Sequence, residues 1–181
     1  MQPLLTRARS AAKLNTNAPA NQIVREWKLK DFGANASLQK RSHEKGKAAF
    51  VKAQCIQCHR FGNDGGLVGP DLSAVGSRFD ARALLESILE PSKVIDDKFR
   101  NITFVLKDGE TKTGMIERET NDQVILRENA FAETATTIAK QSIQRREPSP
   151  ISPMPAGLVN VLSKEEILDL LSLLAAGVRA N

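Results

Sequence analysis

Residues 54–60 read Gln-Cys-Ile-Gln-Cys-His-Arg, and this stretch contains both cysteines of the 181-residue chain. A redox-active Cys-x-x-Cys pair would not require the histidine that follows. A zinc site would need two further ligands, and the only other histidine is His43. Cys-x-x-Cys-His is the attachment pattern of c-type haem, in which the two thiols add to the haem vinyl groups and the histidine binds iron. The motif therefore favours, over the redox and zinc alternatives, one covalently bound haem c held by Cys55 and Cys58, with His59 as an iron ligand.

The iron of such a haem has either a sixth ligand or an open position. The candidate ligands are Met154, Met115, Met1 and His43. Met154 lies in the run Ser-Pro-Met-Pro at 152–155, where the two prolines hold the backbone extended and prevent a helix. Because a capped helix follows this loop, we predict that Met154 binds the iron; the alternative is a methionine that fills a gap in the core. Met115 lies in a strand-like run and His43 in a charged helix, so both are weaker candidates.

The first predicted helix follows an N-cap at Ser37 and runs to about Ala53. Small and apolar residues recur along it at spacings of three and four, which is typical of one buried helix face. Gly46 on that face leaves room for a second helix to approach closely. We expect the last helix of the chain to cross the first one there.

The other two predicted helices have clear N-terminal signals. Asp80 is expected to cap a helix over 81–89, which Pro91 ends. Ser163 and Glu166 form a capping box for the last helix. Its core-facing stripe is predicted to consist of Ile167, Leu170, Leu171 and Leu174.

A glycine-rich segment, 61–77, separates the cysteine motif from the helix over 81–89. Its composition predicts a loop that packs on the haem edge and contains no regular element. Arg78 follows this loop and would pair with a haem propionate through charge-assisted hydrogen bonds. The alternative for Arg78 is an exposed side chain.

A strand-rich stretch interrupts the helical pattern. Residues 100–147 contain several short runs of alternating apolar and polar side chains, and Asp108-Gly109 between the first two runs is a hairpin signal. We predict a small antiparallel β-barrel or rolled sheet of four or five strands. The predicted domains are an N-terminal extension or linker over 1–36, a haem domain formed by 37–97 plus 148–179, and an inserted β subdomain over 98–147.

Together these segments resemble a class I c-type cytochrome, and more narrowly the haem-binding domain found C-terminally in large multidomain planctomycete and verrucomicrobial proteins. The matching stretches, all within about residues 25–177, are 44–50, 55–59, 69–72, 84–91, 153–155 and the final helix. The resemblance implies a mainly α, three-helix haem fold, here α+β overall because of the insertion. It also implies that the carbonyl of Pro70 accepts the Nδ1 hydrogen of His59, a bond that orients a ligand. Such domains are fused behind dehydrogenase-like, propeller-like or helical-repeat regions.

Charge and the predicted haem together indicate electron transfer. Residues 1–60 carry 12 Lys and Arg against 3 Asp and Glu, a net charge of +9, whereas the remainder has a net charge of −4. No DNA-binding motif accompanies the basic end, so we expect no nucleic acid but a redox partner protein or fused dehydrogenase domain, with an acidic surface. The predicted function is electron transfer through one His/Met-ligated haem, with no catalytic residue and no enzyme activity of the chain itself.

Two other functions stay open at this point. If Met154 is absent from the iron or easily displaced, the chain would be a haem-based sensor of small ligands or a peroxidase. Without haem it would be a docking module. The longest uncharged apolar run, 170–178, is much shorter than the roughly 20 residues of a membrane-spanning helix, so we expect no membrane insertion. The resemblance implies a periplasmic or otherwise extracytoplasmic location, although the first residues do not resemble an export signal.

Overall fold

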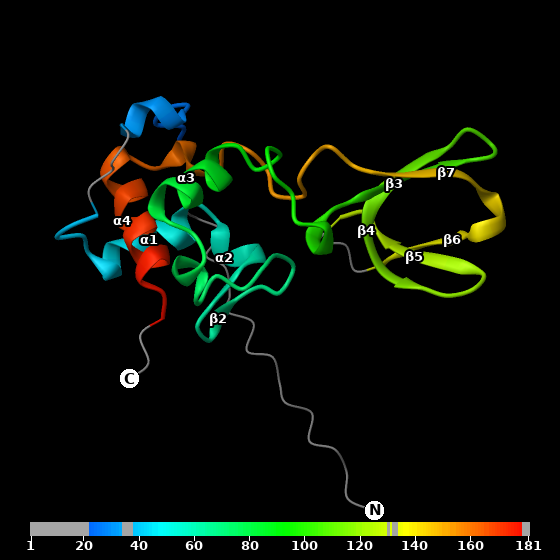
Figure 1. Cartoon of the computed structure of the whole chain (residues 1–181), viewed down its shortest axis with the longest axis horizontal. Coiled ribbons are helices and arrows are strands. Elements are labelled where there is room, and N and C mark those ends of the chain that lie inside the picture. Colours follow the sequence, from blue (N-terminus) through cyan, green and yellow to red (C-terminus); the bar gives the residue numbers. More distant parts are fainter. Residues whose placement is uncertain (1–21, 34–37, 130, 132–133, 179–181) are drawn as a thin grey trace, which may run out of the picture.

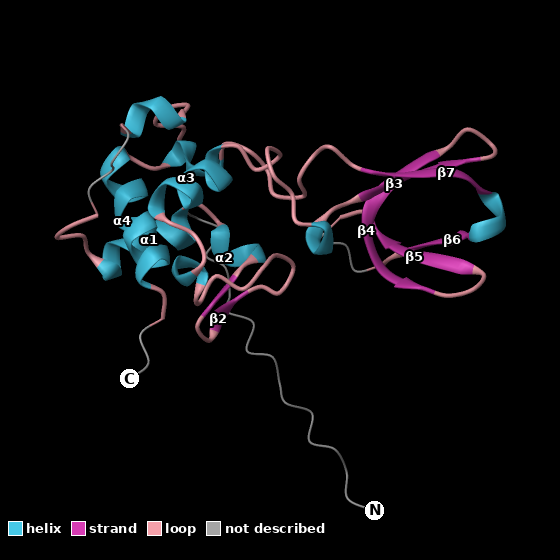
Figure 2. Cartoon of the chain, in the orientation of Figure 1, coloured by secondary structure: helices cyan, strands magenta, loops and turns pink. Residues whose placement is uncertain are grey.

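The structure, a computed structural model, describes residues 22–33, 38–129, 131 and 134–178. Figure 1 shows two lobes, one helical and one formed by a β-sheet, which are joined by two connecting segments. Both ends of the described chain lie in the helical lobe. Figure 2 shows that the longer helices and the longer strands are separated between these lobes. The prediction of an α+β protein is therefore confirmed.

The helical lobe is built from four α-helices, which are α1 (His43–Lys52), α2 (Cys55–Cys58), α3 (Ala81–Leu89) and α4 (Lys164–Ala176). Three short 3-10 helices complete it, namely η1 (Leu29–Phe32), η2 (Val75–Ser77) and η5 (Leu158–Val161). The capping predicted for two helices is confirmed. Asp80 accepts the N–H of Ala83, and Ser163 and Glu166 form a reciprocal capping box. No helix in the described part of the chain is long and apolar enough to cross a bilayer.

Helix α1 begins later than predicted. Ser37 lies outside the described residues, but Lys40 has a φ of 56°, a left-handed conformation through which no right-handed helix can continue. The N-cap is Ser42, whose Oγ accepts the N–H of Lys45 at 3.2 Å. The predicted helix start at Ser37 is therefore wrong.

Helices α1 and α4 pack directly against each other, as predicted. Gly46 of α1 lies against the backbone of Asp169 in α4, with no room for a side chain between them. The predicted stripe of α4 is buried, and Ile167, Leu170 and Leu171 have no exposed surface. This crossing brings the two helices into one apolar core.

The segment before residue 37 also belongs to the helical lobe. Phe32 is buried in its core, and the indole N–H of Trp27 donates to the carbonyl of Leu162 at 3.0 Å. The rings of Trp27 and Phe32 lie 5.4 Å apart. Residues 22–33 therefore pack on the helical lobe and do not only lead into it.

The glycine-rich loop contains short regular elements. Strands β1 (Arg60–Phe61) and β2 (Asp64–Gly65) form a two-stranded antiparallel hairpin, and η2 follows near the end of the loop. The prediction of a loop without regular elements is wrong in this detail, because a two-residue turn is enough to pair such short strands.

The second lobe is a five-stranded antiparallel sheet with the order β6-β5-β4-β3-β7. Its strands are β3 (Ile102–Leu106), β4 (Thr111–Glu119), β5 (Gln123–Arg127), β6 (Thr136–Ala139) and β7 (Ile143–Pro148). The first part of β4 pairs with β3 and the last part with β5, with a shift of register between Ile116 and Arg118 that bends the strand. The 3-10 turn η4 (Lys140–Ser142) links the two outer strands, and Figure 1 shows the sheet rolled around its interior. The predicted four or five antiparallel strands are confirmed.

The rolled sheet has its own buried cluster, which consists of Phe104, Leu106, Val124, Leu126 and Ile138. These residues alternate with outward-facing ones along β3, β5 and β6, as the period of two in the sequence requires. The sheet is therefore a separate packing unit, attached to the helical lobe by the segments that precede β3 and follow β7.

Candidate haem-attachment site

Both cysteines lie on the single turn of α2. The residue before it, Gln54, has a left-handed backbone with a φ of 60°, which separates α2 from α1. The two thiols are free and half-buried. Since residues three apart on a helix are neighbours on one face, the turn presents both sulfur atoms to the same side.

The thiols of this turn are held in the protonated form. Burial raises the pKa of the Cys55 thiol to about 11, and burial also raises the pKa of Cys58. Thiols in this state are weak nucleophiles and poor metal ligands, because the thiolate is the reactive form. A redox-active Cys-x-x-Cys pair requires a lowered pKa, so the site gives the redox alternative no support.

His59 ends α2 and is held by the glycine-rich loop. Its Nδ1 lies 2.9 Å from the carbonyl oxygen of Pro70. A carbonyl only accepts hydrogen bonds, so Nδ1 carries the hydrogen and Nε2 has the free lone pair that binds a metal. The hydrogen bond that the resemblance implied between these two residues is present.

Gly69 lies directly against the imidazole ring of His59. Its N–H donates to the carbonyl of Cys58 at 2.8 Å. A Cβ atom built on Gly69 would lie 2.7 Å from Cε1 and 2.8 Å from Nδ1 of His59. The N–H of Gly66 likewise donates to the carbonyl of Ile56 at 2.9 Å. Gly69 was not identified from the sequence as a contact of the histidine, and its place in the glycine-rich loop was the only local signal.

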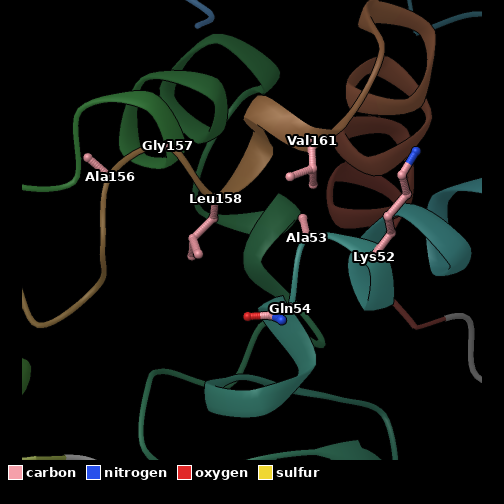
Figure 3. A pocket seen from close by; sticks show the side chains of 7 residues that line it. All are labelled: Lys52, Ala53, Gln54, Ala156, Gly157, Leu158 and Val161. Atoms are coloured by element: carbon pink, nitrogen blue, oxygen red, sulfur yellow. The ribbon is translucent and has the colours of Figure 1, made fainter. Parts of the chain in front are cut away.

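Met154 is half-buried in the segment between β7 and η5. A cavity of about 220 Å³ lies near this segment. One wall comes from the end of α1 and the residue before Cys55, and the other from the residues that follow Met154 (Figure 3). The lining residues are Lys52, Ala53, Gln54, Ala156, Gly157, Leu158 and Val161. The cavity thus lies between the residue that precedes Cys55 and residues that follow Met154 by two positions or more.

The remaining candidates are Arg78, Met115, His43 and Met1. Arg78 is exposed, and its guanidinium stacks 5.3 Å from the ring centre of Phe79. Met115 lies in β4 of the second lobe, His43 is the first residue of α1, and Met1 is outside the described residues. Among the residues that the structure describes, no cluster of three or more His, Cys, Asp or Glu could hold a metal ion, so the zinc alternative gains no further ligand.

The residues present fit a covalently attached haem. Two unpaired thiols lie on one turn, and the next residue is a histidine with a metal-binding nitrogen available. Ile56 of the turn, and Leu72 and Val75 of the following loop, are partly buried and pack against the apolar core of the helical lobe. A search of curated proteins finds no match. A family model does match residues 43–125, from the start of α1 into β5, and thus ends before Met154 and α4. The family is Cytochrome c, so the match supports a c-type cytochrome domain in this chain, with covalent haem c and a role in electron transfer.

Proposed function

We propose that the chain transfers electrons through one haem c, held by Cys55 and Cys58, with His59 and Met154 as the two iron ligands. The observation that carries this proposal is the 2.9 Å hydrogen bond from Nδ1 of His59 to Pro70, which leaves Nε2 free for iron. When bound, the haem supplies reversible one-electron oxidation and reduction of its iron. No residue of the site is required to act as an acid or base in this process.

The residues of the chain supply attachment and orientation. Each thiol adds its sulfur and hydrogen across one vinyl group, which needs no oxidant or reductant. Pro70 and Gly69 fix the ring of His59, and a ligand oriented in this way is a stronger base toward iron. A methionine as the second ligand raises the reduction potential, which suits a chain that accepts electrons from a dehydrogenase.

The proposed partner is an acidic protein surface or a fused dehydrogenase domain. Lys45 and Lys47 are exposed on α1, within the part of the chain that carries a net charge of +9 over residues 1–60. Opposite charges on two proteins raise the rate of their encounter, and salt reduces this effect. We further propose a periplasmic location, in a longer protein of the planctomycete and verrucomicrobial type. Electron transfer from an acidic donor should slow as the salt concentration rises, and more weakly in a Lys45→Gln, Lys47→Gln variant.

The proposed ligands can be tested in protein that has been loaded with haem by a c-type maturation system. The oxidised protein should show the weak far-red absorption band of iron bonded to methionine sulfur. Met154→Ala should abolish this band and speed cyanide binding, whereas Met115→Ala, a matched control in the second lobe, should change neither. An unchanged spectrum in Met154→Ala would exclude Met154 as a ligand.

The same preparation separates the other functions. Rapid binding of carbon monoxide or cyanide to the unmodified protein would favour a sensor or peroxidase with an open position. Absence of haem stain on a denaturing gel would favour a docking module, because the thioether bonds of haem c survive denaturation.

A further inference from the structure

The loop that carries Met154 has few backbone groups that can hold it in place. Pro153 and Pro155 flank the methionine and have no N–H, so between Ser152 and Ala156 only the N–H of Met154 can donate. Among the described residues, no backbone-to-backbone hydrogen bond involves 150–156. The position of this loop therefore depends on side chains.

Serine hydroxyls provide hydrogen bonds to this loop instead. At its start, the N–H of Ile151 donates to Oγ of Ser149 at 3.1 Å. The N–H of Met154 donates to Oγ of Ser152 at 3.1 Å. The N–H of Ser152 donates in turn to Oγ of Ser92 at 3.1 Å. The last two bonds form a continuous link from Ser92 to the backbone of Met154.

Ser92 connects this link to the helical lobe. It follows Pro91, which is buried at the end of α3, and Leu84 and Leu85 of α3 lie in the core of the lobe. The backbone of Ser92 is therefore anchored beside the helices, although the residue itself is exposed.

A separate set of bonds fixes the chain on the other side of the loop. The N–H of Ser149 donates to the carbonyl of Asn101 at 2.9 Å. The guanidinium of Arg100 donates to the carbonyls of Ser149 at 3.3 Å and Ile95 at 2.7 Å. These bonds tie the end of β7 to the segment that enters β3. Ser152 and Ser92 thus provide a hydrogen-bonded link between the methionine loop and the helical lobe, where the cysteine motif lies.

We propose that Ser92 and Ser152 are positioning residues that hold Met154 where its sulfur can bind the iron. This inference rests on the proposed His/Met ligation and extends it to residues that touch neither haem nor iron. Since both serines are at least partly exposed, water can replace their hydrogen bonds, and their loss costs little stability. Loss of these hydrogen bonds instead reduces the fraction of time that the Met154 sulfur is bound to the iron.

The test compares serine variants of the haem-loaded chain. Ser92→Ala and Ser152→Ala should each weaken the far-red band and speed cyanide binding about 2- to 10-fold, the factor that one net hydrogen bond supplies. Their effects should not add in the double variant, because the two bonds form one link. Ser152→Thr, which keeps the hydroxyl, should restore the band and the rate. Ser87→Ala is the matched control, since its hydroxyl bonds only within α3, to the carbonyl of Ala83 at 2.9 Å.

The outcomes separate this inference from the proposed function. If the unmodified protein shows the band and both alanine variants match Ser87→Ala, the positioning role is overturned and His/Met ligation stands. If the unmodified protein lacks the band and Met154→Ala changes nothing, the proposed ligation is overturned and the positioning role with it. Equal thermal midpoints in all serine variants, together with the spectral change, support positioning over a general loss of stability.

Discussion

Gly46 of α1 lies against Asp169 of α4 so closely that a Cβ atom built on the glycine would stand 2.6 Å from the carbonyl oxygen of Asp169. The same atom would lie 2.8 Å from Cβ of Leu173. Two helix backbones can approach this far only where one of them has no side chain. The crossing of the first and last helices, which closes the helical lobe, therefore depends on the absence of a side chain at Gly46.

Replacing Gly46 should destabilise the protein even though glycine is a poor helix former. Gly46→Val gains helix propensity, but the new side chain meets the backbone of α4, and overpacking of this kind costs about 1–3 kcal/mol. Denaturant unfolding of the haem-loaded chain measures this loss. Lys47→Ala, at an exposed position of the same helix, is the control and should change stability by less than about 0.5 kcal/mol. Equal stability of the two variants would contradict the close crossing.

Gly69→Ala should disturb the histidine ligand. Gly69 does not have a positive φ, so alanine fits its backbone, and the new methyl group would meet the ring of His59 at 2.7 Å. The ring or the loop must then move, at a cost of about 1–3 kcal/mol. We expect a changed visible spectrum and less attached haem per chain. Leu67→Ala, in the same loop and 77% exposed, should leave both unchanged; a normal spectrum in Gly69→Ala would argue against this packing.

The elements that local sequence signals specify were predicted well. The caps at Asp80 and Ser163 and the alternation in β3 and β5 act within a few residues, so the sequence alone identifies them. The start of α1 was predicted wrongly because Ser37 and Ser42 are both residue types that cap helices, and the left-handed conformation of Lys40, which excludes the earlier start, leaves no periodic pattern in the sequence.

The features of the site likewise fall into those that a local motif predicts and those that depend on the tertiary fold. The motif at 55–59 carries its own chemistry, whereas the hydrogen bond to Pro70 was expected only from a family resemblance. The contact of Gly69 with His59 and the link from Ser92 to Ser152 join segments that are 10 and 60 residues apart. Such contacts follow from the tertiary fold, and a period of two or 3.6 residues contains no information about them.

Glu119 makes the stability of the rolled sheet dependent on pH. Its carboxylate accepts from Lys140 in η4 at 2.7 Å and from Arg146 in β7 at 3.0 Å, so it joins β4 to the segments that close the sheet. Hydrogen bonds from Lys140 and then Arg146 lower the pKa of Glu119 below its usual 4.5. A carboxyl whose folded pKa is lowered stabilises the protein above that usual value, and this contribution is lost as the pH falls through the folded value.

Glu119→Gln should therefore reduce the free energy of unfolding at neutral pH by about 0.5–1 kcal/mol. The difference from the unmodified protein should shrink as the pH falls from the unfolded value through the lowered folded value, below which the carboxyl is protonated in both states. Urea unfolding at a series of pH values, followed by circular dichroism, measures both effects. Asp122→Asn, at an exposed position in the β4–β5 turn, is the control. A difference that persists undiminished in acid would show that the charge of Glu119 is not the cause.

Cys55 should be slow to react in the chain without haem if that chain keeps this structure. Burial raises the pKa of the Cys55 thiol to about 11, so at pH 8 about one molecule in a thousand has the reactive thiolate. Alkylation of Cys55 by iodoacetamide, measured by peptide mass spectrometry, should accelerate steeply from pH 8 toward 11. At pH 8, adding denaturant should also accelerate it, because unfolding returns the pKa of the thiol to about 8.5. The raised pKa of Cys55 also makes stability depend on pH, and in the opposite direction to that of Glu119. Because the folded state keeps the proton to higher pH, stability falls as the pH rises from about 8.5 through 11. Cys55→Ala should remove much of this fall, whereas fast alkylation of Cys55 at pH 8 without denaturant would mean that the turn of α2 forms only once haem is attached.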